Sequence, residues 1–341
     1  MTKKSYNVAV VGATGAVGGE MIKVLEERDF PVERLIPLAS EKSLGKECAF
    51  RGDRVPVEIL GENSFFGVDI ALFSAGSDVS LKFVPIAAES GAVSVDNTSA
   101  FRMEADVPLV VPEVNAEAIS GWKKRRIIAN PNCSTIQMVV VLAPLNRISH
   151  IRRVVVATYQ AVSGAGIEAV EELSQQSVAL FSQREPRVNV FPHRIAFNCI
   201  PHIDRFLEDG STKEETKMVE ETQKIMGDAS IRVAATAVRV PVFCGHSEAV
   251  NIEFDDPIDI DEAREALSEA PGVSVIDNPN LCRYPLATDA AGKDAVFVGR
   301  IRRDPSVENG LALWIVADNL RKGAALNAVQ IAEILARDHL K

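Results

Sequence analysis

One of the five cysteines in this 341-residue chain stands where a thiol could act as a nucleophile. Cys133 lies in the turn-forming segment 130–135, directly before the apolar stretch 136–145, which predicts a long helix. Partial positive charge at a helix N-terminus stabilises a thiolate, and the N–H groups of Cys133 and Ser134 could stabilise an oxyanion on a carbonyl. This polar setting favours a nucleophile over an inert buried thiol. The other four cysteines lack it, and we interpret them as structural.

Chemistry at a thiol also needs a group that moves protons. The chain has five histidines, and His246 follows a glycine at an expected turn between the strands 231–242 and 248–254, which we expect to form a pair. This position makes His246 the leading candidate, although a histidine in a turn is more often solvated than catalytic.

Three cations could bind an anionic substrate. Arg239 lies inside an apolar strand, so it must either pair with an internal carboxylate or bind a substrate anion. Arg102 follows a strand in a polar loop, where it is either solvated or a ligand for an anion. Lys217 lies on an expected helix rich in charged residues, and that pattern by itself favours a solvated face.

A glycine-rich loop predicts a dinucleotide site. Gly12, Gly15 and Gly18 form the pattern G-x-x-G-x-x-G between a short apolar strand, 7–11, and an expected helix, 16–28. Glycine lets the backbone turn tightly against a ligand, and the helix N-terminus offers free N–H groups to a phosphate. After the second strand, the segment Ser40-Glu41-Lys42-Ser43 offers two hydroxyls and a lysine to a 2′-phosphate, whereas Glu41 opposes it. We therefore favour NADP over NAD.

Composition excludes several classes of protein. Apolar residues make up 47% of the chain and charged residues 25%, which is typical of a globular protein. The net charge of −10 does not favour nucleic acid or an anionic membrane surface as a partner. The chain has no apolar run long enough to span a membrane. Scattered cysteines without a C-x-x-C pair favour neither disulfides nor a metal site, so we expect no metal and a reducing cytoplasm.

The hydrophobic pattern predicts two domains of α/β type. Strands 7–11, 35–39, 68–74 and 92–96 alternate with helical stretches, which indicates a Rossmann-like, doubly wound parallel sheet. Longer strands follow after residue 133, at 153–159, 296–303 and 311–317, which indicates a mixed or antiparallel sheet. The polar stretch 182–194 is the expected exposed loop. We predict a nucleotide-binding domain over 1–132, joined by the C-terminal helix 323–341, and a second, α+β domain over 133–322.

Long motifs in order give the chain a family resemblance. VAVVGATGAVG at 8–18, VDNTSAFR at 95–102, NPNCSTIQM at 130–138, TYQAVSGAG at 158–166, VRVPVFCGHSE at 238–248 and DNLRKGAALNAVQIAE at 318–333 resemble bacterial aspartate-β-semialdehyde dehydrogenases nearly end to end. The resemblance implies a second domain like that of glyceraldehyde-phosphate dehydrogenases, which carries the catalytic residues and the dimer contact. It also implies a homodimer or a dimer of dimers.

The resemblance also implies a role for individual residues. Cys133 would be the nucleophile, His246 the acid/base and Gln160 the residue that orients the substrate. Arg239 would bind the substrate carboxylate, Glu214 its amino group, and Arg102 with Lys217 the phosphate. Asn97 is a further expected substrate contact. The expected NADP contacts are Gly12, Thr14, Gly15, Ala16, Val17, Ser40, Lys42, Ser43, Ser74, Ser163, Gly164 and Asn319.

The implied reaction is the NADPH-dependent reductive dephosphorylation of L-aspartyl 4-phosphate through a cysteine thioester. Its product feeds lysine and diaminopimelate, threonine, methionine and isoleucine synthesis in this family. Alternatives are N-acetyl-glutamyl-phosphate reductase or another acyl-phosphate reductase, and a catalytically silent nucleotide-binding paralogue. One departure concerns the cofactor: Lys42 stands where the family usually has arginine, which keeps the charge but loses the bidentate fork.

Overall fold

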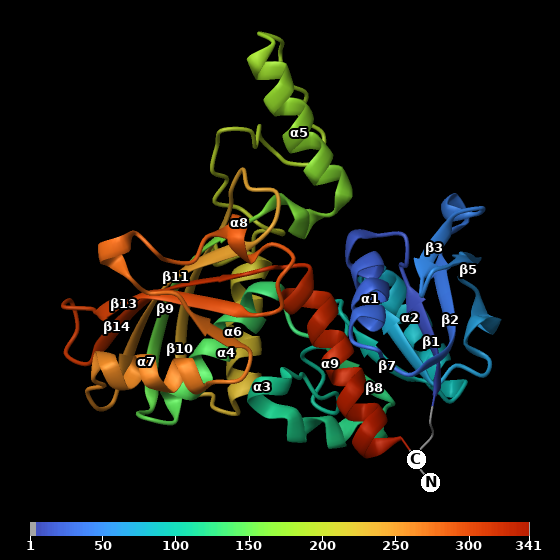
Figure 1. Ribbon diagram of the computed structural model, residues 1–341, viewed down its shortest axis with the longest axis horizontal. Helices are drawn as coiled ribbons and strands as arrows, with labels where there is room; N and C mark the ends of the chain where they lie inside the picture. The colour runs from blue at the N-terminus through green and yellow to red at the C-terminus, as the bar shows by residue number, and fades with distance from the viewer. Residues whose placement is uncertain (1–4, 341) are drawn as a thin grey trace. The chain divides into compact units, whose positions relative to one another are not determined.

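The computed structural model describes residues 5–340, and these divide into two compact units (Figure 1). One unit contains the chain up to Asn132 together with the stretch from Ala324 onward, and the other is Cys133–Gly323. The C-terminal helix therefore belongs to the same unit as the N-terminal strands.

The first unit is built on a six-stranded parallel sheet. Its strand order is β5 (Glu58–Ile59), β2 (Val32–Ala39), β1 (Tyr6–Val11), β6 (Ile70–Phe73), β7 (Val93–Asp96) and β8 (Ile127–Ala129). Residues 8–11 of β1 are completely buried, as a strand covered on both faces requires. Successive strands lie on either side of β1, so the order reverses there, and a doubly wound sheet binds its ligand at such a point. The predicted parallel α/β fold is confirmed.

Helices cover both faces of this sheet. Val8 and Val10 share one apolar core with α1 (Ala16–Glu27) and α9 (Leu326–Ile334), whereas Ala9 and Val11 are buried on the opposite face. There α2 (Ser77–Glu89) contacts β6 and β7. The Tyr6 hydroxyl donates a hydrogen bond of 2.8 Å to the Ala336 carbonyl in the π-helical turn η7 (Leu335–His339), which fastens the chain's last turn to β1.

The remaining elements of the first unit are short. They are the 3-10 turns η1 (Glu41–Ser43), η2 (Glu62–Phe65) and η3 (Ala116–Lys124), the helix α3 (Pro112–Asn115) and the hairpin of β3 (Glu47–Phe50) and β4 (Asp53–Pro56). The hairpin was not predicted, because its strands are mostly exposed and lack an apolar run.

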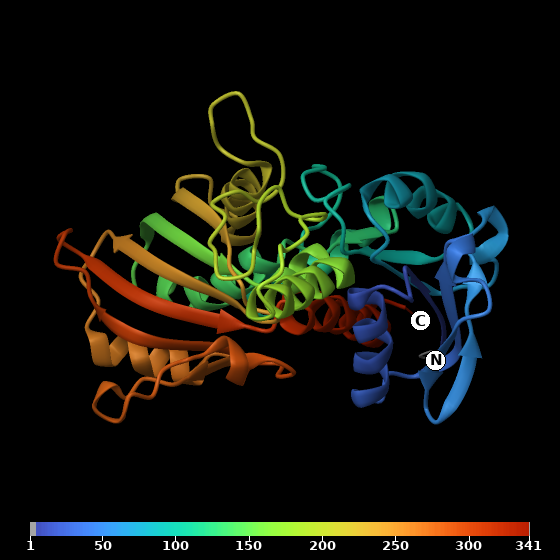
Figure 2. The same ribbon diagram turned by 90° about the horizontal axis from the view of Figure 1, so that it is seen from above.

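The second unit contains a six-stranded mixed sheet, as predicted. Its order is β10 (Arg232–Arg239), β9 (Ile151–Gln160), β11 (His246–Phe254), β14 (Gly310–Ala317), β13 (Val296–Arg303) and β12 (Val273–Val275). The pairs β9–β10 and β12–β13 are parallel and the other three are antiparallel. Figure 2 shows these strands side by side.

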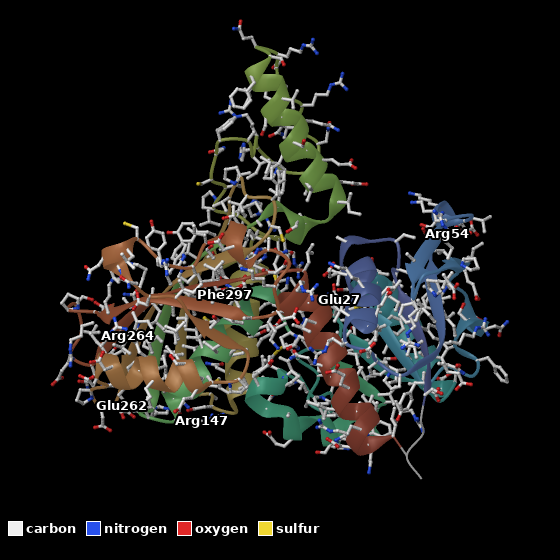
Figure 3. All side chains as sticks on the ribbon, in the orientation of Figure 1. Glu27, Arg54, Arg147, Glu262, Arg264 and Phe297 are labelled. Atoms are coloured by element: carbon white, nitrogen blue, oxygen red, sulfur yellow. The ribbon has the colours of Figure 1, made fainter. Side chains whose placement is uncertain are left out.

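Three helices pack against this sheet or one another. In α4 (Cys133–Asn146), every residue from Ser134 to Leu145 is buried, so this helix runs through the core. α6 (Lys213–Met226) contacts α4 and β10, and α7 (Ile260–Glu269) contacts β12 and β13. Helix α7 is amphipathic: Ala263 and Leu267 are buried, whereas Glu262, labelled in Figure 3, is exposed.

An excursion of the chain extends from the second sheet. It comprises η4 (Val162–Ala165) and α5 (Ile167–Phe181), which projects away from the sheet (Figure 1), and the mostly exposed loop 182–194. The Glu172 carboxylate holds that loop by accepting hydrogen bonds from the N–H groups of Asn189 and Val190 at 2.8 and 2.6 Å. The remaining short elements are η5 (Pro279–Leu281), α8 (Ala287–Ala290) and η6 (Arg321–Ala325).

One strand pairing was predicted wrongly. β10 and β11 do not form a pair, because β9 lies between them. The connection 240–245 crosses the end of β9 and bonds to it: the Val240 N–H donates to the Gln160 carbonyl at 3.0 Å, and the Val162 N–H donates to the Val242 carbonyl at 2.8 Å. His246 is therefore the first residue of a central strand and not part of a hairpin turn.

No helix among the described residues is long and apolar enough to cross a membrane.

We expect an ion cluster in the second unit to make stability depend on pH. Both ring nitrogens of His150 lie 2.8 Å from carboxylate oxygens, Nε2 from Asp228 and Nδ1 from Asp255, and these bonds raise its pKa. A raised pKa stabilises the fold below about pH 6.5, and the benefit is lost as pH rises through the folded value. The difference in unfolding free energy between wild type and His150→Gln should therefore shrink above that pH in chemical denaturation. A difference that stays constant with pH would contradict this.

Candidate active site

Cys133 is the first residue of α4 and is half-buried, unlike the helix behind it. It therefore presents its thiol at the tip of a rigid, core-embedded element. Gly323 packs closely against it, since a Cβ at Gly323 would lie 2.9 Å from the Cys133 Cβ. This close approach was not predicted from the sequence, because a single glycine carries no signal of what it contacts.

His246 is completely buried at the start of β11. Its Nδ1 accepts a hydrogen bond of 3.1 Å from the Ala161 N–H, while Nε2 has no hydrogen-bond partner among residues 5–340. Burial, and then the charge of Arg239, lower the pKa of His246 well below its ordinary value. The imidazole is therefore neutral, and because Nδ1 accepts, its proton lies on Nε2. His246 thus offers an N–H donor to a reacting atom.

Arg239 is buried at the end of β10, and its Nη1 donates a hydrogen bond of 2.8 Å to the Ala161 carbonyl. Burial lowers the pKa of Arg239, while electrostatic interactions with Cys133 and Glu214 act in the opposite direction. A Cβ at Gly164 would lie 2.9 Å from Arg239 Nη1 and 3.2 Å from His246 Nε2. The guanidinium of Arg239 and the imidazole of His246 therefore both lie against Gly164, whose lack of a side chain leaves room for them.

Hydrogen bonds connect Gln160, through Glu214, to the half-buried Lys217. Gln160 Nε2 donates to Glu214 Oε1 at 3.2 Å, and Lys217 Nζ donates to Glu214 Oε2 at 3.2 Å and to Asp204 Oδ2 at 2.7 Å. Although burial lowers the pKa of Lys217 most strongly, the charges of Glu214 and Asp204 outweigh it and the pKa is raised. Glu214 and Lys217 therefore do not lie on a solvated face, contrary to what their charge pattern alone indicates.

The first turn of α6 fixes Glu214 and Lys217 through a capping box. The Thr212 hydroxyl accepts a hydrogen bond from the Glu215 N–H at 3.3 Å, and the Glu215 carboxylate accepts one from the Thr212 N–H at 2.7 Å. These bonds satisfy N–H groups that a helix start leaves unpaired. The sequence Thr-x-x-Glu is a visible signal for this start, and it determines which residues point towards β9.

Ser163 and Asn319, both predicted NADP contacts, bind each other in the second unit. Asn319 Nδ2 donates to Ser163 Oγ at 2.9 Å, and Asn319 Oδ1 accepts from the Gly245 N–H at 3.0 Å. Asn319 thereby fixes the backbone of Gly245, which directly precedes His246. The neighbouring Cys244 is not activated, because burial and then the Asp318 charge raise its pKa to about 12.

The glycine-rich loop of the first unit has the geometry that a phosphate needs. Gly12 has a φ of +87°, and a Cβ at Gly18 would collide with the Gly12 carbonyl oxygen, so both positions need glycine. The N-terminus of α1 carries no acidic residue in its first turn and no side-chain cap, so it can receive an anion. These residues fit the pyrophosphate of a dinucleotide.

The segment after β2 contacts this loop. Thr14 Oγ1 and Ser43 Oγ lie 3.0 Å apart, while Ser40 and Lys42 are exposed. Ser74 lies beside Gly12, because a Cβ on that glycine would approach Ser74 Oγ to 3.1 Å. The structure therefore gathers the predicted cofactor residues of the first unit around one loop.

Arg102 and Asn97, the predicted substrate contacts of the first unit, lie at the carboxyl end of β7. Arg102 is buried, and its Nε and Nη2 each donate a hydrogen bond of 2.9 Å, to the carbonyls of Asn130 and Asn97. Asn97 Oδ1 accepts a hydrogen bond of 2.7 Å from Asn130 Nδ2. Arg102 is thus a fixed cation and not a mobile loop residue.

Sequence reasoning missed three residues of the second unit that bond to the proposed site residues, Ala161, Asp204 and Gln137, and a fourth, Glu248, that shares a face of the sheet with His246. Ala161 acts through its backbone, which no side-chain pattern reveals. Asp204 adopts a left-handed φ of 66° in an irregular segment. Gln137 and Glu248 lie inside a helix and a strand, and only the buried position of those elements marks them as unusual.

Comparison with known proteins gives consistent matches along the chain. A family model described as the NAD binding domain of semialdehyde dehydrogenase matches residues 7–122, and one described as its dimerisation domain matches residues 142–322. Aspartate-semialdehyde dehydrogenase of Aquifex aeolicus is 58% identical over 98% of this chain and 99% of its own length, and that of Bacillus subtilis is 50% identical over 99% of each.

Solved structures agree with these matches. The crystal structure of aspartate semialdehyde dehydrogenase II complexed with ASA from Vibrio cholerae superposes with a TM-score of 0.97 at 53% identity, covering 99% of this chain and 100% of that one. The Candida albicans enzyme with NADP gives a TM-score of 0.75 at 26% identity, covering 97% and 98% of the two chains.

The contact at Gly164 yields a prediction. We expect Gly164→Ala to fold normally but to lower kcat/KM by about tenfold to a hundredfold, because the new methyl group displaces Arg239 and His246 from their positions. Gly121→Ala is the matched control, since its nearest atoms, in Pro108, would be an ordinary 3.7 Å away. Steady-state kinetics measures kcat/KM of both variants, and thermal unfolding checks that both are folded. Equal kcat/KM in Gly164→Ala and Gly121→Ala would refute the prediction.

Proposed function

The chain belongs to the aspartate-semialdehyde dehydrogenase family, and on that premise we propose that it reduces L-aspartyl 4-phosphate to L-aspartate 4-semialdehyde and phosphate with NADPH. The observation that carries this function is the convergence of a half-buried cysteine, a neutral histidine and a buried arginine within one unit. The product would enter the synthesis of lysine and diaminopimelate, threonine, methionine and isoleucine.

In this proposal, Cys133 is the nucleophile. Its sulfur, as the thiolate, bonds to the acyl carbon of the substrate, the bond from that carbon to the phosphate oxygen breaks, phosphate leaves and a thioester remains. The Nε2–H group of His246 then holds a proton at the carbonyl oxygen, where negative charge develops when the tetrahedral centre forms. A nicotinamide cofactor held by the first unit would supply the hydride that the thioester carbon accepts. When the carbon–sulfur bond breaks, the aldehyde leaves and Cys133 is regenerated.

We propose that the charges around the thiol recognise an amino acid. Arg239 offers a buried guanidinium, which matches a carboxylate in a planar, bidentate manner. Glu214 offers a buried carboxylate for the amino group, and Gln160, bonded to it, orients the substrate. Lys217 is the proposed phosphate ligand of the second unit, and Arg102 that of the first.

The family model shows that a nucleotide-binding domain is present, and we propose that NADP is its preferred cofactor. Thr14, Ser40, Lys42 and Ser43 would face the 2′-phosphate, while Gly12, Gly15, Ala16 and Val17 would hold the pyrophosphate. Ser74 of the first unit and Ser163, Gly164 and Asn319 of the second would contact the nicotinamide half. We also propose a homodimer formed through the second unit, in keeping with the dimerisation domain that matches it.

The first test is a spectrophotometric assay in the reverse direction. Aspartate semialdehyde, phosphate and NADP should give NADPH, and Cys133→Ala should lower the rate by about a thousandfold or more, because no other group forms the thioester. Cys199→Ala, at an exposed cysteine, is the matched control and should keep its activity.

Three outcomes separate the alternatives. Turnover that survives in Cys133→Ala would refute the thiol mechanism. Turnover only with N-acetyl-glutamate semialdehyde would identify the related acyl-phosphate reductase. Retained NADP binding with no turnover of any semialdehyde would identify a silent nucleotide-binding paralogue.

Cofactor preference gives a further prediction. Lys42→Ala should weaken NADP binding by about tenfold or more and leave NAD binding nearly unchanged, because a charge-assisted bond to the 2′-phosphate is worth about 1.5–3 kcal/mol. Fluorescence titration of both cofactors measures this, with the exposed Lys23→Ala as the control for loss of a positive charge. Equal losses for the two cofactors would show that Lys42 does not contact the 2′-phosphate.

A further inference from the structure

A second pair of polar side chains lies one step deeper in the core than Cys133 and His246. Gln137 follows Cys133 by four residues on α4, so the two share a helix face. Glu248 follows His246 by two residues on β11, so these two share a face of the sheet. The regular spacing of helix and strand therefore places Gln137 and Glu248 behind the proposed nucleophile and acid/base.

These two side chains are completely buried and incompletely bonded. Neither carboxylate oxygen of Glu248 has a hydrogen bond within residues 5–340, and Gln137 Oε1 also has none. Gln137 Nε2 donates a long hydrogen bond of 3.5 Å to the His246 carbonyl. The residues opposite Glu248 on β9 and β14 are Thr158 and Ile315, neither of which carries a charge.

An ionised carboxylate in such a place would be very costly. Burial raises the pKa of Glu248 well above its ordinary value, and the nearby Gln137 amide opposes this only in part. A protonated carboxyl group needs an acceptor for its hydrogen, and Gln137 Oε1 needs a donor. Each of the two unsatisfied groups therefore supplies what the other lacks.

We propose that Glu248 is a neutral positioning residue that donates a hydrogen bond to Gln137 and thereby holds the backbone of His246 in place for the reaction. The inference rests on the proposed acid/base role of His246. Gln137 donates to the His246 carbonyl, and the Ala161 N–H donates to the His246 ring. Hydrogen bonds therefore hold His246 at both its backbone and its side chain. A proton-transfer group needs such support, because small displacements from the reacting atom cost rate.

Two substitutions at Glu248 distinguish a protonated, neutral carboxyl group from an ionised one. Glu248→Gln keeps the shape and a donor for Gln137, so we expect kcat within about threefold of wild type and an unchanged pH profile of kcat. Glu248→Leu removes the donor, and we expect it to lower kcat at least about tenfold, to shift the pH profile and to leave KM nearly unchanged. Gln137→Leu should behave like Glu248→Leu and serves as the second variant if that protein does not fold.

Unfolding measurements test the neutral state without any turnover. Because the folded state keeps the Glu248 proton to a higher pH than the unfolded state, wild type loses stability relative to Glu248→Gln as pH rises above about 4.5. The ratio of their unfolding constants should change about tenfold per pH unit until the folded group titrates. Cys133 on α4 and His246 on β11, which share faces with Gln137 and Glu248, are present in both proteins, so their own titration cancels in this ratio.

Two results would overturn the inference. One is a loss in Glu248→Gln as large as in Glu248→Leu, together with a pH-independent stability ratio, which would indicate an ionised carboxylate. The other is a wild-type rate and pH profile in both Glu248→Leu and Gln137→Leu. Failure of the proposed function is recognised separately, because wild type and Cys133→Ala would then have equal activity.

Discussion

The site of the second unit depends on the two backbone groups of one residue. The N–H of Ala161 donates to His246 and its carbonyl accepts from Arg239, so a single residue at the end of β9 sets the position of both side chains. Because Nδ1 of His246 is occupied by the N–H, the ring proton is confined to Nε2. The bond to the carbonyl fixes the guanidinium of Arg239, which is the proposed ligand of the substrate carboxylate. Rigid β-structure can hold such geometry where a flexible side chain could not.

This arrangement requires the neighbouring elements to be nearly immobile. Helix α4 is buried on all sides, so it is held by the core and not by a solvated face, and its first residue is fixed accordingly. Glycines replace side chains where elements meet, at Gly164 beside His246 and at Gly323 beside Cys133. The same burial that fixes the elements removes water and keeps His246 neutral. Burial therefore accounts both for the rigid position of these elements and for the neutral state of His246.

The sequence was informative where a local pattern has one structural solution. Apolar strands alternating with helices predict the parallel sheet, and the position of Cys133 at a helix start follows from the turn before it. The neighbours of β10 could not be predicted, because strand order depends on contacts far apart in the chain. For the same reason, the charge pattern around Lys217 suggested a solvated face, although α6 packs against α4 and β10. Gln160 and Glu214 become partners only after the chain has folded.

The buried charges also bear on which acyl phosphate fits. Glu214 is buried and accepts hydrogen bonds from Gln160 and Lys217, and its charge also acts on Arg239. In the proposed function, this carboxylate binds the cationic amino group of the substrate. An N-acetylated substrate has no such charge, and it would leave a buried carboxylate poorly compensated next to a bulky acetyl group. Sites built to bond a polar group discriminate strongly against ligands that lack it. The proposed roles of Arg239 and Glu214 therefore favour a substrate with a free amino group, and they would explain a preference for aspartyl phosphate over N-acetylated acyl phosphates.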